Sequence, residues 1–410
     1  MSRSLRIPST VLAVGIFMLV GDVRPAHAQL IISEFRTFGP GGTTTLRDND
    51  EYIVIYNNSG ADHTVAPVSG GGYGVAASDG VTRCSIPTGT VIPNRGYYLC
   101  VNSVGYNQAT YPAGNGTTAT GDATFTTDIP ANAGIAIFNN DTGGGSYSLA
   151  NRLDAVGSSS EANSLYREGA GYPPVNGSFP IDAAFYRDTC GKGGSITTMG
   201  VCSISSPKDT NNNAADFLWV DSNGTSAGAG QRLGAASPRN LSSPIERNAS
   251  ISANLLDTCS SSSTPPNRVR DFTADAANNS TFGTIDFRRT FVNNTGGNVT
   301  RLRVTIIDIT TFPAPSGFAD LRPRTSTDVV VTVDRPPCGS GTSNITVHGT
   351  TLEQSGILQP NGGGFNSTLS AGTITLGTPL ANGASVDIRF LMGIQQTGTF
   401  KLYMNIEVLP

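Results

Sequence analysis

The segment from 209 to 216 has oxygen-bearing side chains at a spacing that calcium-binding loops use. In Asp-Thr-Asn-Asn-Asn-Ala-Ala-Asp, the oxygen donors at alternate or near-alternate positions are Asp209, Asn211, Asn213 and Asp216. Carboxylate and carboxamide oxygens are the ligands that Ca²⁺ takes in proteins. The match is incomplete, because Ala214 stands where such loops have glycine and Val220 where they have a bidentate glutamate. Calcium is one interpretation of these residues, and an exposed polar loop before a strand is the other.

A second motif, Gly224-Thr225-Ser226-Ala227-Gly228, has the form G-x-S-x-G of a hydrolase nucleophile elbow. The elbow places its serine on a sharp turn between a strand and a helix. Residues 229–234 would make a poor helix, and the only downstream histidine is the distant His348. In a chain with 49 glycines, we interpret the match as a loop. The sequence therefore predicts no catalytic residue and no organic cofactor.

Two other groups of side chains leave alternatives open. Asp48, Asp50 and Glu51 are either a metal site or solvated loop charges, and the second interpretation is favoured. Aromatic residues are either a stacking platform for sugars or part of the core; they are Tyr97, Tyr98, Tyr106, Tyr111 and Trp219.

The chain has an even number of cysteines, which in an exported protein suggests disulfides. They are Cys84, Cys100, Cys190, Cys202, Cys259 and Cys338. Local spacing favours Cys84–Cys100 across a predicted hairpin and Cys190–Cys202, which leaves Cys259–Cys338. Zinc is disfavoured, because no C-x-x-C occurs and histidine is scarce.

Residues 1–28 have the features of a secretory signal. Arg3 and Arg6 precede the apolar run 11–20, and Ala26-His27-Ala28 suits a signal peptidase. The run is too short to span a bilayer, and no later stretch is longer. We therefore expect a mature protein that is secreted or lies at the cell surface, with no transmembrane segment.

Composition favours strands and disfavours nucleic acid. The chain is 14% charged and 38% hydrophobic, its formal net charge is −4, and only Lys192, Lys208 and Lys401 are lysines. Helix formers are scarce and turn formers abundant. Without a basic excess, counterion release cannot drive nucleic-acid binding.

Apolar patterning of period two recurs along the chain and predicts an all-β fold of two Ig-like β-sandwiches joined by a Ser/Pro-rich linker. We expect the first sandwich over 29–245, with a loop-rich insertion near 157–213. The linker is expected over 246–267 and the second sandwich over 268–410. The strands predicted are 30–36, 52–56, 73–77, 96–101, 134–138, 152–156, 215–221, 284–292, 302–306, 328–333, 345–351, 373–376, 385–390 and 400–408.

Several motifs of the first module resemble a lamin tail domain of the exported bacterial kind. They are Leu-Ile-Ile-Ser-Glu-Phe (30–35), Asp-Glu-Tyr-Ile-Val-Ile-Tyr-Asn-Asn (50–58), Gly-Tyr-Gly-Val (72–75), Val-Ile-Pro-Asn-Arg-Gly-Tyr-Tyr-Leu (91–99) and Ala-Ser-Pro-Arg-Asn-Leu (236–241). The resemblance covers roughly 29–245 and implies an Ig-like sandwich used as an accessory or interaction module. Residues 379–385 loosely resemble Ig-like repeats of bacterial surface proteins.

These features predict a non-enzymatic extracellular or cell-surface protein that uses its sandwich modules for adhesion, scaffolding or ligand binding. Its partner is expected to be an extracellular protein or a glycan. A carbohydrate-binding module and a secreted hydrolase are the alternatives, and each requires a site that the sequence does not identify.

Overall fold

The structure is a computed structural model that describes residues 30–176, 181–189, 206–224, 231–353 and 362–410. Over these residues the chain is almost entirely strand and turn, which confirms the predicted all-β class. The α-helices described are α1 (Thr44–Asp48) and α2 (Asn213–Asp216), of five and four residues. The 3₁₀ turns described are η1 (Gly144–Ser146), η2 (Ser164–Tyr166) and η3 (Ala276–Asn278).

Two sheets packed face to face form what we call the N-terminal sheet pair. Within the described residues, the larger sheet has the order β13-β12-β11-β1-β2-β7-β8 and the smaller one β10-β9-β4-β5. The larger sheet consists of β1 (Leu30–Arg36), β2 (Tyr52–Asn57), β7 (Tyr97–Asn102), β8 (Ala123–Phe125), β11 (Ala183–Arg187), β12 (Phe217–Asp221) and β13 (Arg232–Leu233). The smaller sheet consists of β4 (Gly72–Ala77), β5 (Thr82–Pro87), β9 (Ile135–Phe138) and β10 (Arg152–Val156). A separate short ribbon pairs β3 (His63–Thr64) with β6 (Val91–Ile92).

Alternation along each strand decides which core a side chain enters. In β2, Ile53 and Ile55 pack into the core between the two sheets of the N-terminal pair. Tyr52, Val54 and Tyr56 lie on the opposite face and belong to another core, which extends into the C-terminal half of the chain. The seven-stranded sheet is therefore buried on both faces, as the apolar character of both faces of 52–56 indicates.

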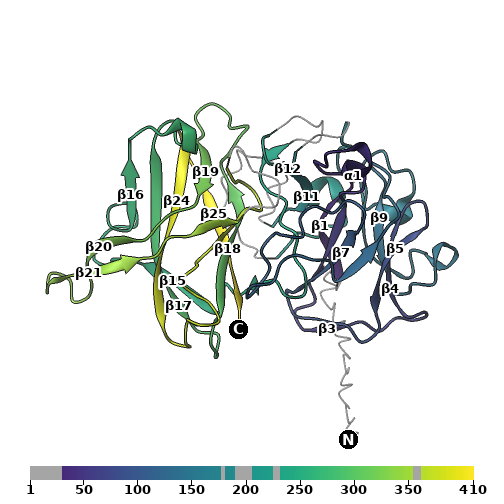
Figure 1. Cartoon of the computed structure of the whole chain (residues 1–410), viewed down its shortest axis with the longest axis horizontal. Helices are drawn as coiled ribbons and strands as arrows, with labels where there is room; N and C mark the ends of the chain where they lie inside the picture. Colours follow the sequence, from purple (N-terminus) through teal and green to yellow (C-terminus); the bar gives the residue numbers. More distant parts are fainter. Residues whose placement is uncertain (1–29, 177–180, 190–205, 225–230, 354–361) are drawn as a thin grey trace, which may run out of the picture.

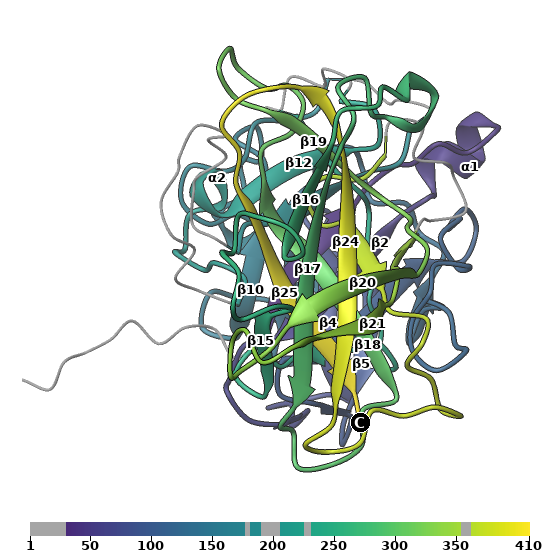
Figure 2. The ribbon, with the colours of Figure 1, turned by 90° about the vertical axis from the view of Figure 1, so that its left-hand side faces the viewer.

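The C-terminal half forms a second packed arrangement, the C-terminal sheet pair. Its inner sheet has the order β14-β25-β18-β23-β22, and its outer sheet has the order β15-β17-β24-β19 with β16 paired to β17. Figure 2 views the outer sheet face-on, with the β20–β21 ribbon crossing in front of it. The inner strands are β14 (Ile245–Glu246), β18 (Arg301–Ile309), β22 (Thr351–Glu353), β23 (Thr368–Ser370) and β25 (Leu402–Leu409). The remaining strands are β15 (Ile251–Leu255), β16 (Arg268–Asp271), β17 (Thr284–Asn293), β19 (Asp320–Arg324), β20 (Val329–Asp334), β21 (Thr342–Val347) and β24 (Ser385–Gln396).

The two pairs lie side by side, and the seven-stranded sheet faces the inner sheet of the C-terminal pair (Figure 1). Leu302, Val304 and Ile306 of β18 belong to the core that extends from the seven-stranded sheet into the C-terminal half. The intervening Thr305 instead hydrogen-bonds Arg239 on the N-terminal side, 2.9 Å from its Nη2. Tyr111 completes the contact, because its hydroxyl lies 2.5 Å from Oγ1 of Thr368 on β23.

Charged side chains are buried in this contact, which we call the inter-pair interface. Arg239, 5% exposed, lies 3.4 Å from a Glu407 oxygen and 3.8 Å from a Glu34 oxygen. Burial opposes ionisation of Glu407, but Arg239 and Arg303 outweigh it and lower the pKa of that carboxyl. For Glu34 the effect of burial is the larger one, so the pKa of this carboxyl is raised although Arg239 opposes the shift. The interface thus depends on guanidinium groups that compensate carboxylates removed from water.

The two segments expected as a linker and as a loop-rich insertion each contain a strand. The predicted linker 246–267 includes β15, which pairs with β17. At the start of the linker, the backbone of Glu246 in β14 lies opposite that of Glu407 in β25. The predicted insertion 157–213 includes β11, which lies between β1 and β12 in the seven-stranded sheet. Both contain short apolar stretches, around Ile251 and Phe185, whose burial outweighs the turn-forming residues beside them. The module boundaries themselves stay predictions.

Two of the predicted disulfides are present, Cys84–Cys100 and Cys259–Cys338. The reason given for the first was wrong. Cys84 lies on β5 of the smaller sheet and Cys100 on β7 of the larger one, so the bond joins two layers rather than two strands of a hairpin. The predicted Cys190–Cys202 pair lies outside the described residues.

The inter-pair interface generates a stability prediction. Arg239→Met removes the cation and leaves Glu407 and Glu34 buried without it, so we expect a loss of about 3–5 kcal/mol in the free energy of unfolding. Arg335→Met, which breaks a pair with Asp387 at a side chain that is 42% exposed, should cost less than about 1 kcal/mol. Urea unfolding of both variants measures the difference, and equal losses would contradict the role assigned to Arg239.

Candidate functional site

Arg187, at the end of β11, is the centre of a buried group of acids. Its Nη2 donates to both carboxylate oxygens of Asp154, at 3.1 and 2.9 Å. Its Nη1 lies 3.4 Å from Asp209 and 3.5 Å from Asp216. Nε donates to the carbonyl oxygen of Ile32 at 2.8 Å, so the guanidinium is anchored to β1 as well as to the acids. The side chain is fully buried.

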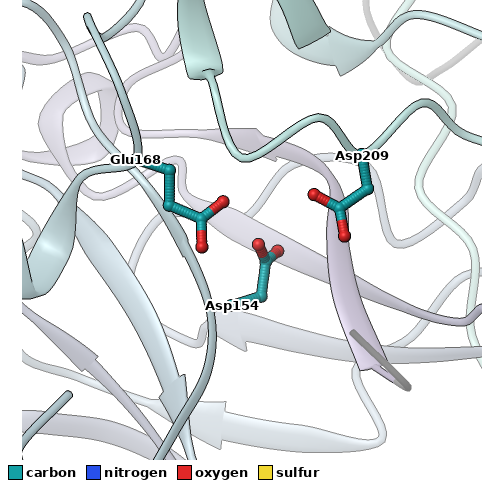
Figure 3. Close-up of side chains that lie close together, drawn as sticks. All are labelled: Asp154, Glu168 and Asp209. Carbon is teal, nitrogen blue, oxygen red and sulfur yellow. The ribbon is translucent and has the colours of Figure 1, made fainter. Parts of the chain in front are cut away.

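Three carboxylates converge beside this arginine. Asp154 on β10, Glu168 after η2 and Asp209 before α2 each offer an oxygen, and these oxygens lie within 4.8 Å of one another. Figure 3 shows the three carboxyl groups directed toward a common point. We call these residues the acidic triad. All three are buried, with exposures of 1%, 6% and 8%.

Burial dominates the electrostatics of the triad. It raises the pKa of Asp154 to about 6, although Arg187 opposes the shift. It raises the pKa of Glu168 to about 8, and the negative charge of Asp154 adds to the effect. One Glu168 oxygen accepts a hydrogen bond from Arg152 at 3.1 Å, whereas its Oε2 is buried without a hydrogen-bond partner. The triad therefore has a carboxylate oxygen that protein donors leave unsatisfied.

The structure separates the four residues predicted from the 209–216 spacing. Asp209 joins the triad, while Asp216 accepts hydrogen bonds from the Thr210 amide and hydroxyl at 2.9 and 2.7 Å. Asn211 has a positive φ of 55° in the turn between them. The side chains of the 209–216 segment therefore contact different partners, and calcium binding by all four of the residues stays a prediction.

Asn213 has a structural task of its own. Its Oδ1 accepts the amides of Gly157 and Glu168, both at 2.9 Å, and its Nδ2 donates to the Ala155 carbonyl at 2.9 Å. Through these three hydrogen bonds the side chain fixes the backbone of two neighbouring segments. It holds the end of β10, the loop at Glu168 and α2 together, and thereby positions the triad.

Sequence reasoning missed Asp154 and Glu168. One signal was available, because Asp154 interrupts the apolar segment Leu-Asp-Ala-Val, and a carboxylate on a buried strand requires a partner. Nothing in the sequence identifies that partner as Arg187 or brings Glu168 to it.

A cavity of about 580 Å³ opens at the end of the N-terminal pair beside α1. We call it the α1 pocket. It is lined by Thr37, Phe38, Thr44, Thr45, Asp48, Asn49, Asp128, Ile129, Ala131, Asn132 and Val175. Asn132 and Val175 are hydrogen-bonded to each other in one wall of the pocket. The Asn132 side-chain amide donates to the Val175 carbonyl oxygen at 3.0 Å, and the Val175 backbone amide donates to the Asn132 side-chain oxygen at 2.8 Å. Burial raises the pKa of Asp128, and the negative charge of Asp48 raises it further.

The predicted cluster Asp48, Asp50 and Glu51 does not form one site. Asp48 is 46% exposed at the pocket, as expected of a solvated charge. Asp50 and Glu51 are fully buried, which contradicts that interpretation for them. Asp50 pairs with Arg36, and Glu51 accepts bonds from Asn102 at 2.8 Å and from the Ile129 amide at 2.7 Å. Burial raises the pKa of Glu51 to about 8.

The aromatic residues considered for sugar stacking belong to the interior. Tyr97, Tyr98, Tyr111 and Trp219 are between 1% and 7% exposed, and Tyr106 packs against a core while partly buried. They form no exposed platform. The elbow motif is described only at Gly224, because 225–230 lie outside the described residues.

Comparison with known proteins found no matching family model and no significant match among curated proteins or solved structures. In the described part of the chain, no helix is long and apolar enough to cross a membrane.

The hydrogen bonds of the Asn213 side chain predict a loss of stability when that side chain is shortened. Asn213→Ala leaves two buried amides and one carbonyl without their partner, so the free energy of unfolding should fall by about 2 kcal/mol or more. Asn211→Gly, two residues away, should change it little because glycine accepts a positive φ. Denaturant unfolding tests both variants. An unchanged free energy of unfolding in Asn213→Ala would show that the hydrogen bonds of this side chain are not needed for stability.

Glu51 predicts a dependence of stability on pH. The folded protein keeps the proton up to about pH 8, whereas the unfolded chain releases it near 4.5. Between those values the unfolded state binds fewer protons, so rising pH destabilises the wild type, by up to about 1.4 kcal/mol per pH unit. Glu51→Gln lacks this proton, and its stability should rise relative to wild type from pH 5 to pH 8. Parallel stability curves for the two proteins would contradict the assignment.

Proposed function

We propose that this chain is an exported, non-enzymatic binding protein whose N-terminal sheet pair is a lamin-tail-like module. The two most specific motifs of that resemblance, 30–35 and 50–58, form neighbouring strands β1 and β2 at the centre of the larger sheet. The disulfides are compatible with an oxidising, extracellular environment.

The observation that carries the proposal is the α1 pocket. Its volume falls in the range of small-ligand sites, which is about 300–1,000 Å³. The reciprocal bonds between Asn132 and Val175 hold its wall in place without a ligand. A preformed wall reduces the ordering that a ligand would have to impose. This combination favours binding at the end of the sandwich over a purely scaffolding role.

The lining indicates the chemistry of the ligand. Threonine hydroxyls and two carboxylates offer hydrogen bonds, while Phe38 and the exposed Ala131 offer apolar contact. Sugars present both kinds of surface, hydroxyl groups at the ring edge and C–H groups on its face. Asp48 and Asp128 make the pocket acidic, so it should favour cationic or neutral glycans and repel uronic acids. We therefore propose a glycan ligand, amino sugars above all.

Titration with three oligosaccharides of equal length tests the ligand class: oligomers of glucosamine, of N-acetylglucosamine and of galacturonic acid. The first should bind most tightly and the last not measurably. In the Asp48→Asn/Asp128→Asn variant, glucosamine oligomers should bind at least about tenfold more weakly, because the charge that attracts them is removed.

The matched control is Asp271→Asn, an exposed acid of β16 in the C-terminal pair, which should leave binding unchanged. Binding of galacturonate oligomers at the pocket would contradict the proposed charge preference. Release of new reducing ends from any of the three oligosaccharides would overturn the non-enzymatic proposal.

A further inference from the structure

We propose that the acidic triad, Asp154, Glu168 and Asp209, binds one calcium ion. The site is distinct from the α1 pocket and does not depend on the proposed glycan. It shares only Asp209 with the four residues that the sequence spacing suggested.

The geometry allows one ion to reach all three side chains. Calcium binds oxygens at about 2.3–2.6 Å, so a single ion can join oxygens as far apart as about 4.8 Å. The triad oxygens all lie within that separation. The donor set contains only carboxylates, which suits a hard cation and not the sulfur or nitrogen preferences of zinc or copper.

A second observation points into the same place. The Glu168 side chain is 5% exposed, and its Oε2 has no hydrogen-bond partner. In Figure 3 this carboxyl group points toward those of Asp154 and Asp209. A buried carboxylate oxygen without a donor is costly, and a bound cation would remove that cost.

The local charges leave room for a cation. Asp154, Glu168, Asp209 and Asp216 surround two guanidinium groups, those of Arg152 and Arg187. The Nζ of nearby Lys208 donates to the Ala215 carbonyl at 2.7 Å. Arg187 compensates Asp154 directly, whereas Arg152 reaches only one oxygen of Glu168. The four acids thus outnumber the two guanidinium groups, and Oε2 of Glu168 is a triad oxygen that neither of them reaches.

The backbone around the triad is already fixed. The side-chain oxygen of Asn213 accepts hydrogen bonds from the backbone amides of both Gly157 and Glu168. The backbone amide of Asn213 in turn donates to the Glu168 carbonyl oxygen at 3.0 Å. Ligands held in this way bind a cation without first ordering a loop.

The test uses the whole mature protein, treated with chelator and then titrated with calcium chloride by calorimetry, with terbium luminescence as a second probe. We expect one calcium per chain and an increase in the thermal midpoint on adding calcium. Glu168→Gln should retain the fold, by circular dichroism, and bind calcium at least about tenfold more weakly. Glu161→Gln, which changes a charge in the same loop outside the triad, should bind as the wild type does.

Several results would overturn the proposal. If the wild type neither takes up calcium nor gains thermal stability from it, the proposal is overturned without the need for a variant. Equal calcium affinity in wild type and Glu168→Gln would place the ion elsewhere. If Glu168→Gln does not fold, Asp209→Asn provides the same comparison, and unchanged calcium binding in that variant would likewise overturn the site.

Discussion

The seven-stranded sheet has a core on each of its faces, and most of the architecture depends on this double burial. One face, with Ile53 and Ile55, packs on the smaller N-terminal sheet, and the other, with Val54 and Tyr56, belongs to the core shared with the C-terminal half. Removing either cover would expose a row of large apolar side chains to water, at a cost of about 25 cal/mol for each Å². The two sheet pairs are therefore energetically coupled through one central layer.

The inter-pair interface contains buried charged side chains, and this has a physical consequence. Apolar faces pack in many registers, whereas Arg239 satisfies Glu407, Thr305 and Asn366 only when β18 and β25 lie in one position against the N-terminal pair. Hydrogen bonds from the Asn366 amide to Glu34 and from Ser237 to the Asn366 carbonyl add to the same restriction. Polar contacts of this kind contribute to specificity of alignment as well as to stability.

Strands with regular alternation were predictable, and contacts between distant segments were not. The predicted limits of 30–36 and 152–156 agree with β1 and β10, because apolar residues and turn signals delimit both. The strand predicted at 215–221 begins only at Phe217, since Asn213–Asp216 form α2. The strand predicted at 373–376 is absent, and those residues form a bend and turn. Asp209 was singled out from local spacing, but its neighbours Asp154 and Glu168 come to it only through tertiary packing.

The position of the Cys84–Cys100 bond also determines when it can form and break. Both cysteines face the closed space between the two N-terminal sheets, and their exposures are 4% and 0%. Dissolved thiols and oxidants reach that space only while the layers are apart, so the crosslink has to form before the sheets close. Once they have closed, a reducing agent must wait for the layers to separate. Cys338 lies on an exposed turn, so the second bond remains open to exchange. The same chain thus has one disulfide that the folded sheets shield from the redox conditions of the solution and one that can exchange with them.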